Sequence, residues 1–267
     1  MTVEPQKLNV AVNERESVTA LLYSASPKLK RDRAGITVLL GHGAGASQTS
    51  PFMRRFANGL ATRGFDGMTF NFLYTEQGRR SPDPKAKLES CCRAVIGAAH
   101  DHNKLKGNRL VIGGKSMGGR IASQVAAAMQ GKQGTEVQDT RKRSTSIRQI
   151  DAVGEARQLP EWRLSPEDIT GLVFLGYPLH PPGKPDQLRA EHLKNIRAPM
   201  LFVQGSRDAF GTPDELGAII KNFHLPATLH VIEGGDHSLS VLKSSSVPQQ
   251  QVYETAMDEI AQWLRSR

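Results

Sequence analysis

The sequence predicts an α/β fold, in which a mostly parallel central sheet carries helices on both faces and one domain spans residues 1–267. Three observations lead to this prediction. Short apolar runs alternate with longer segments of helical periodicity, as in sheets that are covered on both faces. The chain has 267 residues, 38% of them hydrophobic, which is enough to bury one large core. One apolar run leads through a G-x-S-x-G sequence directly into a helical segment, an order typical of a tight strand-to-helix turn.

The elements follow from periodicity in chain order. Alternating polar and apolar residues predict an opening hairpin from the segments 8–12 and 17–23. Apolar runs predict the further strands, which cover 36–40, 66–73, 109–113, 169–179, 200–204 and 228–232. Helical spacing predicts the helices, which cover 52–63, 84–105, 120–129, 186–195, 213–222 and 249–265.

One segment, 131–164, interrupts this alternation because it is polar and has almost no apolar periodicity. A structureless connection of this length is unusual in a compact domain. We therefore predict a disordered or mobile insertion here. The basic residues 141–143 precede a Ser-Thr-Ser sequence, which admits phosphorylation or nuclear targeting, although a solvated loop explains such short patterns more often.

Composition and charge exclude several classes of function. The formal net charge of +9 could attract nucleic acid. However, no basic stripe is interleaved with aromatic residues, and only 6% of residues are aromatic, which argues against a nucleic-acid partner.

No apolar run approaches the ~20 residues needed to cross a bilayer, so no membrane partner is expected. The start of the chain lacks the pattern of a secretory signal. The only cysteines, Cys91 and Cys92, are adjacent and make no disulfide framework. We expect a cytoplasmic location, with the nucleus as the alternative.

Gly114-Lys115-Ser116-Met117-Gly118 is the most informative stretch of the chain. It lies between the predicted strand 109–113 and the predicted helix 120–129, the setting of a nucleophile elbow. Glycines stand two residues to either side of Ser116, where larger side chains would collide with the neighbouring strand and helix. This pattern predicts Ser116 as the nucleophile.

A serine hydroxyl needs a base to remove its proton, and the base needs a carboxylate to orient it. After a nucleophile elbow these groups follow in the order acid, then histidine. Asp208 follows the strand 200–204 and is the predicted acid, with Asp214 as the reserve candidate. His237 follows the strand 228–232 after two glycines and is the predicted base. Asp236 adjoins His237, but neighbouring side chains point apart.

Backbone amides must also stabilise the oxyanion of a tetrahedral intermediate. The Met117 amide, just after the serine, is one predicted donor. The other is expected from the loop after the strand 36–40, where the Ala44 amide is favoured and those of Gly43 and Gly45 stay open. His42 is expected to brace this loop rather than act as a base. The loop lacks the spacing of a phosphate cradle.

The other histidines carry less information. His100 and His102 are two residues apart on a predicted helix, which points them to different faces and argues against a zinc pair. His180 could line the mouth of the site or hydrogen-bond within its proline-rich loop. The sequence thus predicts no metal and no organic cofactor.

Four motifs together resemble the α/β-hydrolase superfamily. They are Gly41-His42-Gly43-Ala44-Gly45, the stretch 113–120 around Ser116, the proline-rich stretch 176–184, and Gly235-Asp236-His237-Ser238. The second and third are similar to the dienelactone-hydrolase-related group, which includes testis-expressed protein 30 and the hydrolase-like subunit 3 of the NSL histone acetyltransferase complex. The resemblance implies a Ser116–Asp208–His237 triad and an α/β-hydrolase fold. No large cap domain is expected, because only a short proline-rich loop follows the strand 169–179.

These observations predict a serine hydrolase that acts on a small-molecule carboxylic ester, thioester or lactone through an acyl-enzyme. Acyl transfer to an alcohol or amine would use the same triad and stays open. The alternative from another class is a non-catalytic or weakly catalytic interaction subunit, such as an adaptor in a chromatin complex. In that case the segment 131–164 would be the surface for a protein partner.

Overall fold

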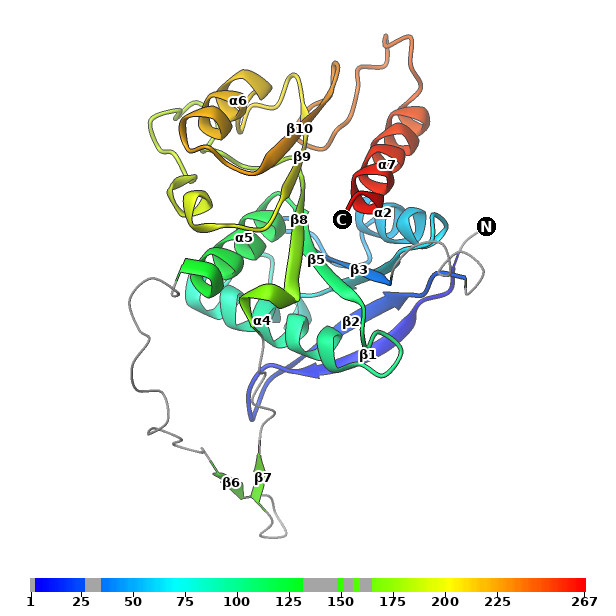
Figure 1. Cartoon of the computed structure of the whole chain (residues 1–267), viewed down its shortest axis with the longest axis vertical. Coiled ribbons are helices and arrows are strands. Elements are labelled where there is room, and N and C mark those ends of the chain that lie inside the picture. The colour runs from blue at the N-terminus through cyan, green and yellow to red at the C-terminus, as the bar shows by residue number, and fades with distance from the viewer. Residues whose placement is uncertain (1–2, 27–34, 132–147, 151–155, 159–164) are drawn as a thin grey trace.

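The central sheet organises the chain in the computed structural model, which describes residues 3–26, 35–131, 148–150, 156–158 and 165–267. Its eight strands have the order β1-β2-β4-β3-β5-β8-β9-β10 (Figure 1). The strands are β1 (Gln6–Ala11), β2 (Ser17–Tyr23), β3 (Ile36–Gly41), β4 (Asp66–Phe70), β5 (Arg109–Lys115), β8 (Ile169–Leu175), β9 (Met200–Gly205) and β10 (Ala227–Ile232).

Six strands of this sheet run parallel to one another, namely β4, β3, β5, β8, β9 and β10, whereas β2 pairs antiparallel with both β1 and β4. The mostly parallel sheet and the opening hairpin are therefore confirmed. Strands β3 and β5 are buried along nearly their whole length, which is why they are continuous apolar runs in the sequence. Because parallel strands share one direction, the segments that follow β3, β5, β8, β9 and β10 meet at the same edge of the sheet.

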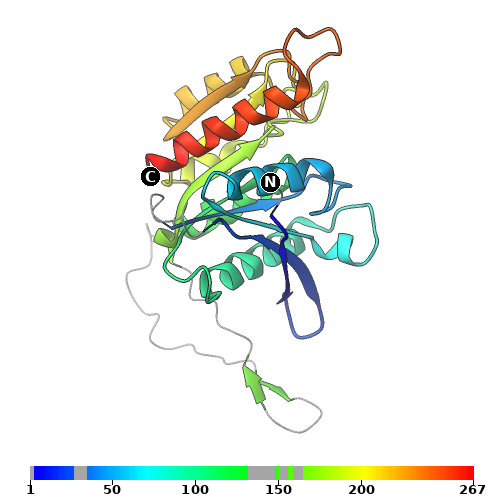
Figure 2. The same cartoon turned by 90° about the vertical axis from the view of Figure 1, so that its right-hand side faces the viewer.

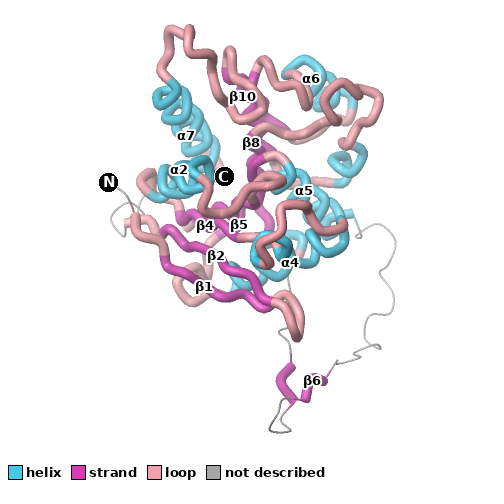
Figure 3. Tube along the Cα trace, turned by 180° about the vertical axis from the view of Figure 1, so that it is seen from behind, coloured by secondary structure: helices cyan, strands magenta, loops and turns pink. Residues whose placement is uncertain are grey.

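Helices cover both faces of the sheet. They are α2 (Pro51–Ala61), α3 (Leu73–Glu76), α4 (Lys85–Asp101), α5 (Met117–Gln130), α6 (Pro213–Asn222) and α7 (Gln249–Arg265). Residues of α2 and α7, such as Phe56 and Ile260, pack into one apolar cluster. Residues of α4 and α5, such as Val95 and Ile121, pack into the other. Figure 2 looks onto the face with α2 and α7, and Figure 3 shows α4 and α5 on the opposite side of the strands.

Several predicted elements extended too far. The helix predicted at 84–105 ends at Asp101, because His102 has extended backbone, and the helix predicted at 52–63 ends at Ala61. The strand predicted at 66–73 ends at Phe70, because the Phe72 amide turns to donate to His42 Nε2 instead of to a strand. The strand predicted at 169–179 ends at Leu175, because Gly176 takes a positive φ of 66° that breaks the extended chain. The helix predicted at 186–195 is reduced to the 3₁₀ helix η3 (Glu191–Asn195).

Most of the segment 131–164 lies outside the described residues, so its disordered or mobile character stays a prediction. Within it the structure describes two short strands, β6 (Arg148–Ile150) and β7 (Ala156–Gln158), which pair antiparallel. A second 3₁₀ helix, η2 (Pro166–Asp168), leads into β8. Between β8 and β9 the described chain holds only loops and η3, so there is no large cap domain at that position.

Two smaller expectations concern the cysteines and the membrane. Cys91 and Cys92 on α4 are both buried and unbridged. Burial raises the pKa of the Cys92 thiol to about 12, so it packs as a small apolar side chain. Among the described helices, none combines the length and apolar character that a bilayer crossing requires.

Candidate active site

Ser116 occupies the sharp turn between β5 and α5. Its backbone has a φ of 50° and a ψ of −115°, a conformation that costs free energy for any residue except glycine. Two glycines make the turn sterically feasible. A Cβ at Gly114 would lie 2.1 Å from the carbonyl oxygen of Gly41, and one at Gly118 would lie 2.2 Å from the same atom. The backbones of β3 and α5 therefore approach too closely here for any side chain.

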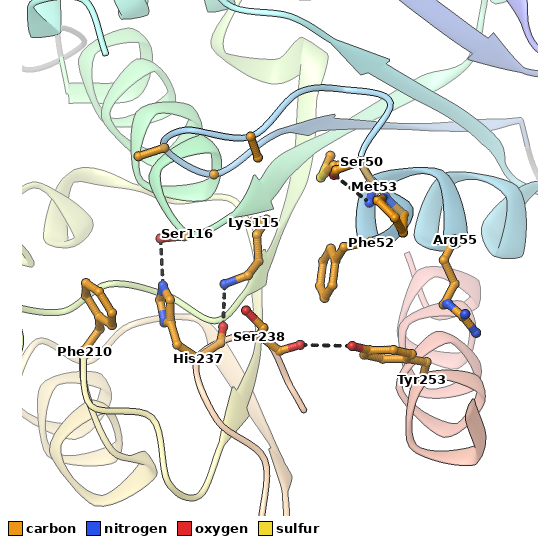
Figure 4. Close-up of a pocket in the computed structure, with 14 residues that line it drawn as sticks. Ser50, Phe52, Met53, Arg55, Lys115, Ser116, Phe210, His237, Ser238 and Tyr253 are labelled. Carbon is orange, nitrogen blue, oxygen red and sulfur yellow. Dashed lines mark hydrogen bonds between the residues drawn. The ribbon is translucent and has the colours of Figure 1, made fainter. Parts of the chain in front are cut away.

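Ser116, His237 and Asp208 form one chain of hydrogen bonds. The Nε2 atom of His237 lies 2.8 Å from Ser116 Oγ (Figure 4). On the other side of the ring, Nδ1 lies 2.8 Å from Asp208 Oδ2 and 3.0 Å from Oδ1. Because a carboxylate only accepts, Nδ1 carries the proton, and Nε2 is left to accept from the serine hydroxyl. Asp214, the reserve acid, is exposed in the first turn of α6 and is not a partner of the ring.

Asp208 is completely buried and its carboxylate is saturated with donors. Its side chain is 0% exposed. Besides the imidazole, Oδ1 accepts from the Phe210 amide at 2.8 Å, and Oδ2 accepts from Gln204 Nε2 at 2.8 Å. A buried carboxylate with such partners is held in a single orientation. It therefore fixes both the tautomer and the direction of the His237 ring.

Gln204 is a supporting residue that the sequence analysis did not single out. It is fully buried at the end of β9. Its Nε2 donates also to the Gly211 carbonyl at 2.7 Å, and its Oε1 accepts from the Tyr177 amide at 2.8 Å. It thus joins the loops after β8 and β9 beneath the acid. The available signal was a glutamine directly after the apolar run 200–203, a place where a buried polar group must find partners.

Lys115 and Phe210 also contact His237 and were likewise not predicted. Lys115 Nζ donates to the His237 backbone carbonyl. Burial lowers the pKa of Lys115 to about 8, against the opposing effect of the Asp208 and Asp236 carboxylates. The Phe210 ring stacks on the imidazole at a centroid distance of 4.0 Å. The sequence signal for the Lys115 contact was a lysine at the end of an otherwise apolar strand.

The predicted oxyanion donors lie beside the serine. Met117 is the first residue of α5, where a backbone amide has no partner within the helix. Gly43 and Ala44, from the loop after β3, line a cavity together with Ser116, whereas Gly45 does not. The individual amide that would receive the oxyanion stays a prediction, with Ala44 as the favoured donor.

His42 braces this loop, as expected. Its Nδ1 donates to the Gly43 carbonyl at 2.8 Å, and its Nε2 accepts from the Phe72 amide at 3.3 Å. The residue is 0% exposed, and burial lowers the pKa of its imidazole to about 4. A neutral imidazole with both nitrogens engaged holds the loop in place and is not available as a base.

Of the two roles predicted for His180, the structure supports hydrogen bonding within its loop. Its Nδ1 donates to the Pro181 carbonyl at 2.8 Å, and its Nε2 lies 3.3 Å from Glu215 Oε1. It lines neither cavity that adjoins Ser116. For His100 and His102, the described residues contain no group of three His, Cys, Asp or Glu side chains placed to hold a metal.

A cavity of about 610 Å³ opens at the serine. Its walls are mainly apolar and come from α2, α7 and the loop after β9 (Figure 4). Phe52 and Met53 lie on the α2 side, Tyr253 on the α7 side, and Phe210 beside the imidazole. An apolar group bound here would lie against the serine hydroxyl. A serine whose proton an adjacent imidazole can take, next to an apolar cavity, can attack an acyl carbonyl.

Comparisons with known proteins agree with this architecture. Residues 34–138 and 155–265 match a family model described as an alpha/beta hydrolase domain. An alpha-beta serine hydrolase homologue from Coxiella burnetii is similar in structure, with a TM-score of 0.61 and 15% identity, over 100% of this chain and 97% of that one. A dienelactone hydrolase from Anabaena variabilis has a TM-score of 0.61 and 17% identity, over 97% of each chain. Est1E from Butyrivibrio proteoclasticus has a TM-score of 0.64 and 12% identity, over 98% of this chain and 99% of that one. At these identities the solved structures establish a shared fold.

Proposed function

This chain belongs to the alpha/beta hydrolase domain family, and we propose that it is a serine hydrolase that cleaves a carboxylic ester, thioester or lactone through an acyl-enzyme on Ser116. The observation that carries the proposal is the unbroken hydrogen-bond chain from Ser116 Oγ through His237 to Asp208, with 2.8 Å at each link. Fold membership alone would not support an activity, since one fold hosts many functions.

In the first half-reaction, Ser116 Oγ attacks the carbonyl carbon of the substrate while His237 Nε2 takes the hydroxyl proton. The carbonyl oxygen becomes an oxyanion that accepts hydrogen bonds from the Met117 amide and from an amide of the 43–45 loop, for which we propose Ala44. The imidazolium then gives its proton to the leaving oxygen or sulfur. The bond from the carbonyl carbon to that atom breaks, and an acyl ester remains on Ser116.

In the second half-reaction, His237 takes a proton from water, and the resulting hydroxide attacks the acyl carbon. Collapse of the second tetrahedral intermediate returns the proton to Ser116 Oγ and releases the carboxylic acid. Asp208 stabilises the imidazolium in both steps without taking its proton. If an alcohol or amine attacked the acyl-enzyme in place of water, the acyl group would be transferred to that alcohol or amine.

Labelling with a fluorophosphonate probe tests the proposal, because the probe reacts only with an activated serine. The wild-type protein and the matched variant Ser244→Ala, which removes an exposed hydroxyl, should label. Ser116→Ala and His237→Ala should not. Hydrolysis of short-chain 4-nitrophenyl esters, a thioester and a lactone should follow the same order. Labelling or hydrolysis that survives Ser116→Ala at the wild-type rate would contradict the mechanism.

The interaction-subunit alternative depends on the segment 131–164, most of which lies outside the described residues. Deletion of residues 132–147 is its direct test. Loss of a protein partner without any change in fluorophosphonate labelling would assign binding to the segment and chemistry to the serine.

A further inference from the structure

A second cavity, of about 260 Å³, opens onto the same serine. It shares Ala44, Ser116 and Phe210 with the larger cavity. Its remaining wall comes from three places, namely the first turns of α5, the start of α4 with the loop before it, and the loop after β8. A substrate held at Ser116 can therefore extend one part into each cavity. Both cavities have mainly apolar walls, and the smaller one gathers four charged side chains, which are Asp83, Lys85, Arg120 and Arg189.

Two arginines line the smaller cavity without a carboxylate partner. Arg120 lies one turn after the nucleophile, and its amide donates to the Ser116 carbonyl at 3.0 Å. Arg189 lies in the loop after β8, where its amide donates to the Leu179 carbonyl at 2.8 Å. Among the residues that the structure describes, neither guanidinium lies within 4.0 Å of an acidic oxygen. The Nε atom of Arg120 is in addition buried without a hydrogen-bond partner in the described structure.

The other charges at this cavity are already paired. Lys85 lies 3.6 Å from Glu89, and Asp83 Oδ1 accepts from Arg79 at 2.6 Å. The balance at the cavity is therefore positive. Burial and the charge of Arg189 lower the pKa of Arg120, and burial together with Lys85 and Arg120 lowers the pKa of His192 to about 4.

Both arginines are half-buried, and the buried, unpartnered Nε of Arg120 carries a desolvation cost that is relieved when a ligand supplies an anion. The planar fork of arginine matches a carboxylate or a phosphate. Asp83 favours the anion of smaller charge, because it lines the same cavity and only its Oδ1 is paired with Arg79, whereas its Oδ2 is buried without a hydrogen-bond partner in the described structure. A dianionic phosphate would meet stronger repulsion from this oxygen than a monoanionic carboxylate.

We propose that this Arg120–Arg189 cavity is a substrate subsite for a carboxylate, so that the ester, thioester or lactone cleaved at Ser116 carries an anionic group. The inference rests on the proposed function and narrows its substrate class. The carboxylate-bearing part of the substrate occupies the smaller cavity, and the apolar part occupies the larger one. Ser116 lies where they meet, so the scissile carbonyl lies between the two parts.

Matched substrates test the subsite. The first pair is the 4-nitrophenyl monoester of adipic acid and its terminal primary amide, which place a carboxylate or a neutral isostere on the acyl part. The second pair is the butyrate ester of 3-hydroxybenzoic acid and that of 3-hydroxybenzamide, which place the same difference on the leaving group. One of the two pairs should show a kcat/KM at least tenfold higher for the carboxylate member, and that pair identifies the part that enters the cavity.

Three variants locate the preference. Arg120→Gln and Arg189→Gln should each lower kcat/KM for the preferred carboxylate substrate about 10- to 100-fold, mainly through KM, because each removes charge-assisted hydrogen bonds. The amide substrate should change less than about threefold. Arg120→Lys should restore part of the preference, because it keeps the charge but loses the fork. Arg265→Gln, which neutralises an exposed arginine on α7, is the matched control and should keep the wild-type ratio.

A binding measurement separates failure of the subsite from failure of the proposed function. Calorimetric titration of adipate into the Ser116→Ala protein should show binding that Arg189→Gln abolishes, and inorganic phosphate should bind at least tenfold more weakly. Equal rates within both pairs, with fluorophosphonate labelling intact, would overturn the subsite and leave the serine hydrolase. Tighter binding of phosphate than of adipate would overturn the assignment to a carboxylate. Absence of labelling and of hydrolysis would overturn the hydrolase, and adipate binding would still decide whether the arginines hold a carboxylate.

Discussion

Lys115 Nζ donates a hydrogen bond to the backbone carbonyl oxygen of His237 (Figure 4). The two residues are 122 positions apart in the chain. Lys115 ends β5 directly before the serine, and His237 lies in the loop after β10. The contact therefore joins the two segments whose relative position sets the distance from Ser116 Oγ to the imidazole. A Cβ at Gly176 would lie 2.4 Å from the same His237 carbonyl oxygen, so the loop after β8 can pass this close to the acceptor only with a glycine at this position.

The first prediction concerns this contact. Lys115→Met keeps the length of the side chain but removes the donor, so the His237 loop loses its tether to β5. We expect kcat for a short-chain 4-nitrophenyl ester to fall about tenfold or more, since a small misplacement of a catalytic base is costly. Lys221→Met, at an exposed site on α6, is the control and should match the wild type. An unchanged rate in a folded Lys115→Met protein would show that the tether does not position the base.

The second prediction separates the two candidate acids. Asp208→Asn keeps the shape of the side chain but can place an amide nitrogen, which donates a hydrogen bond, where a carboxylate oxygen accepted one from His237 Nδ1. That replacement favours the wrong tautomer of His237. We expect the rate of fluorophosphonate labelling to fall roughly a thousandfold or more. Asp214→Asn, in the exposed first turn of α6, should leave the rate unchanged. The reverse order would assign the acid to Asp214.

The third prediction compares two helical glycines with opposite surroundings. A Cβ at Gly118 would lie 2.2 Å from the Gly41 carbonyl oxygen, whereas one at Gly217 on α6 would meet nothing within 4 Å. Gly118→Ala should therefore lower the free energy of unfolding by several kcal/mol or prevent folding. Gly217→Ala should raise it by roughly 0.5–1 kcal/mol, because alanine loses less conformational entropy in a helix. Urea unfolding of both variants measures the difference, and equal effects would show that the elbow is not closely packed.

The fourth prediction concerns stability at acidic pH. Burial lowers the pKa of His42 to about 4 in the folded protein, whereas an unfolded histidine titrates near 6.5. Below pH 6.5 the unfolded chain binds a proton that the folded protein does not, so this contribution to the free energy of unfolding is complete above pH 6.5 and is lost as the pH falls toward 4. The full loss amounts to roughly 3 kcal/mol.

His42→Gln measures this contribution. The variant is less stable at neutral pH because the loop brace changes, so the informative quantity is the slope of stability against pH. The free energy of unfolding of wild type minus that of the variant should decrease between pH 6.5 and pH 4. A difference that stays constant over this range would contradict a buried neutral imidazole. His192→Gln should show a decrease of the same sign, because the pKa of His192 is lowered to about 4 as well.

Local patterns in the sequence were sufficient for the chain order of the strands in the central sheet and of the longer helices, but they did not predict α3, β6 or β7. Periodicity depends on which face of an element is buried, and that information is written in consecutive residues. The same holds for the elbow, because a tight turn needs glycines at fixed offsets from Ser116. Element ends were less predictable. The strand predicted at 66–73 stops at Phe70, and the Phe72 amide instead donates to His42, thirty positions before Phe72 in the chain. No local window contains that contact.

What the sequence by itself determined is therefore the fold class, the elbow and the three residues Ser116, Asp208 and His237 as candidates in the right order. Only the tertiary structure decided that their atoms meet at hydrogen-bonding distance, and that Gln204 and Lys115 hold them there. It alone brought Arg120 and Arg189 to one cavity. The physical reason is that hydrogen bonds and charge pairing act over a few ångströms in space, between segments that only the folded sheet places side by side.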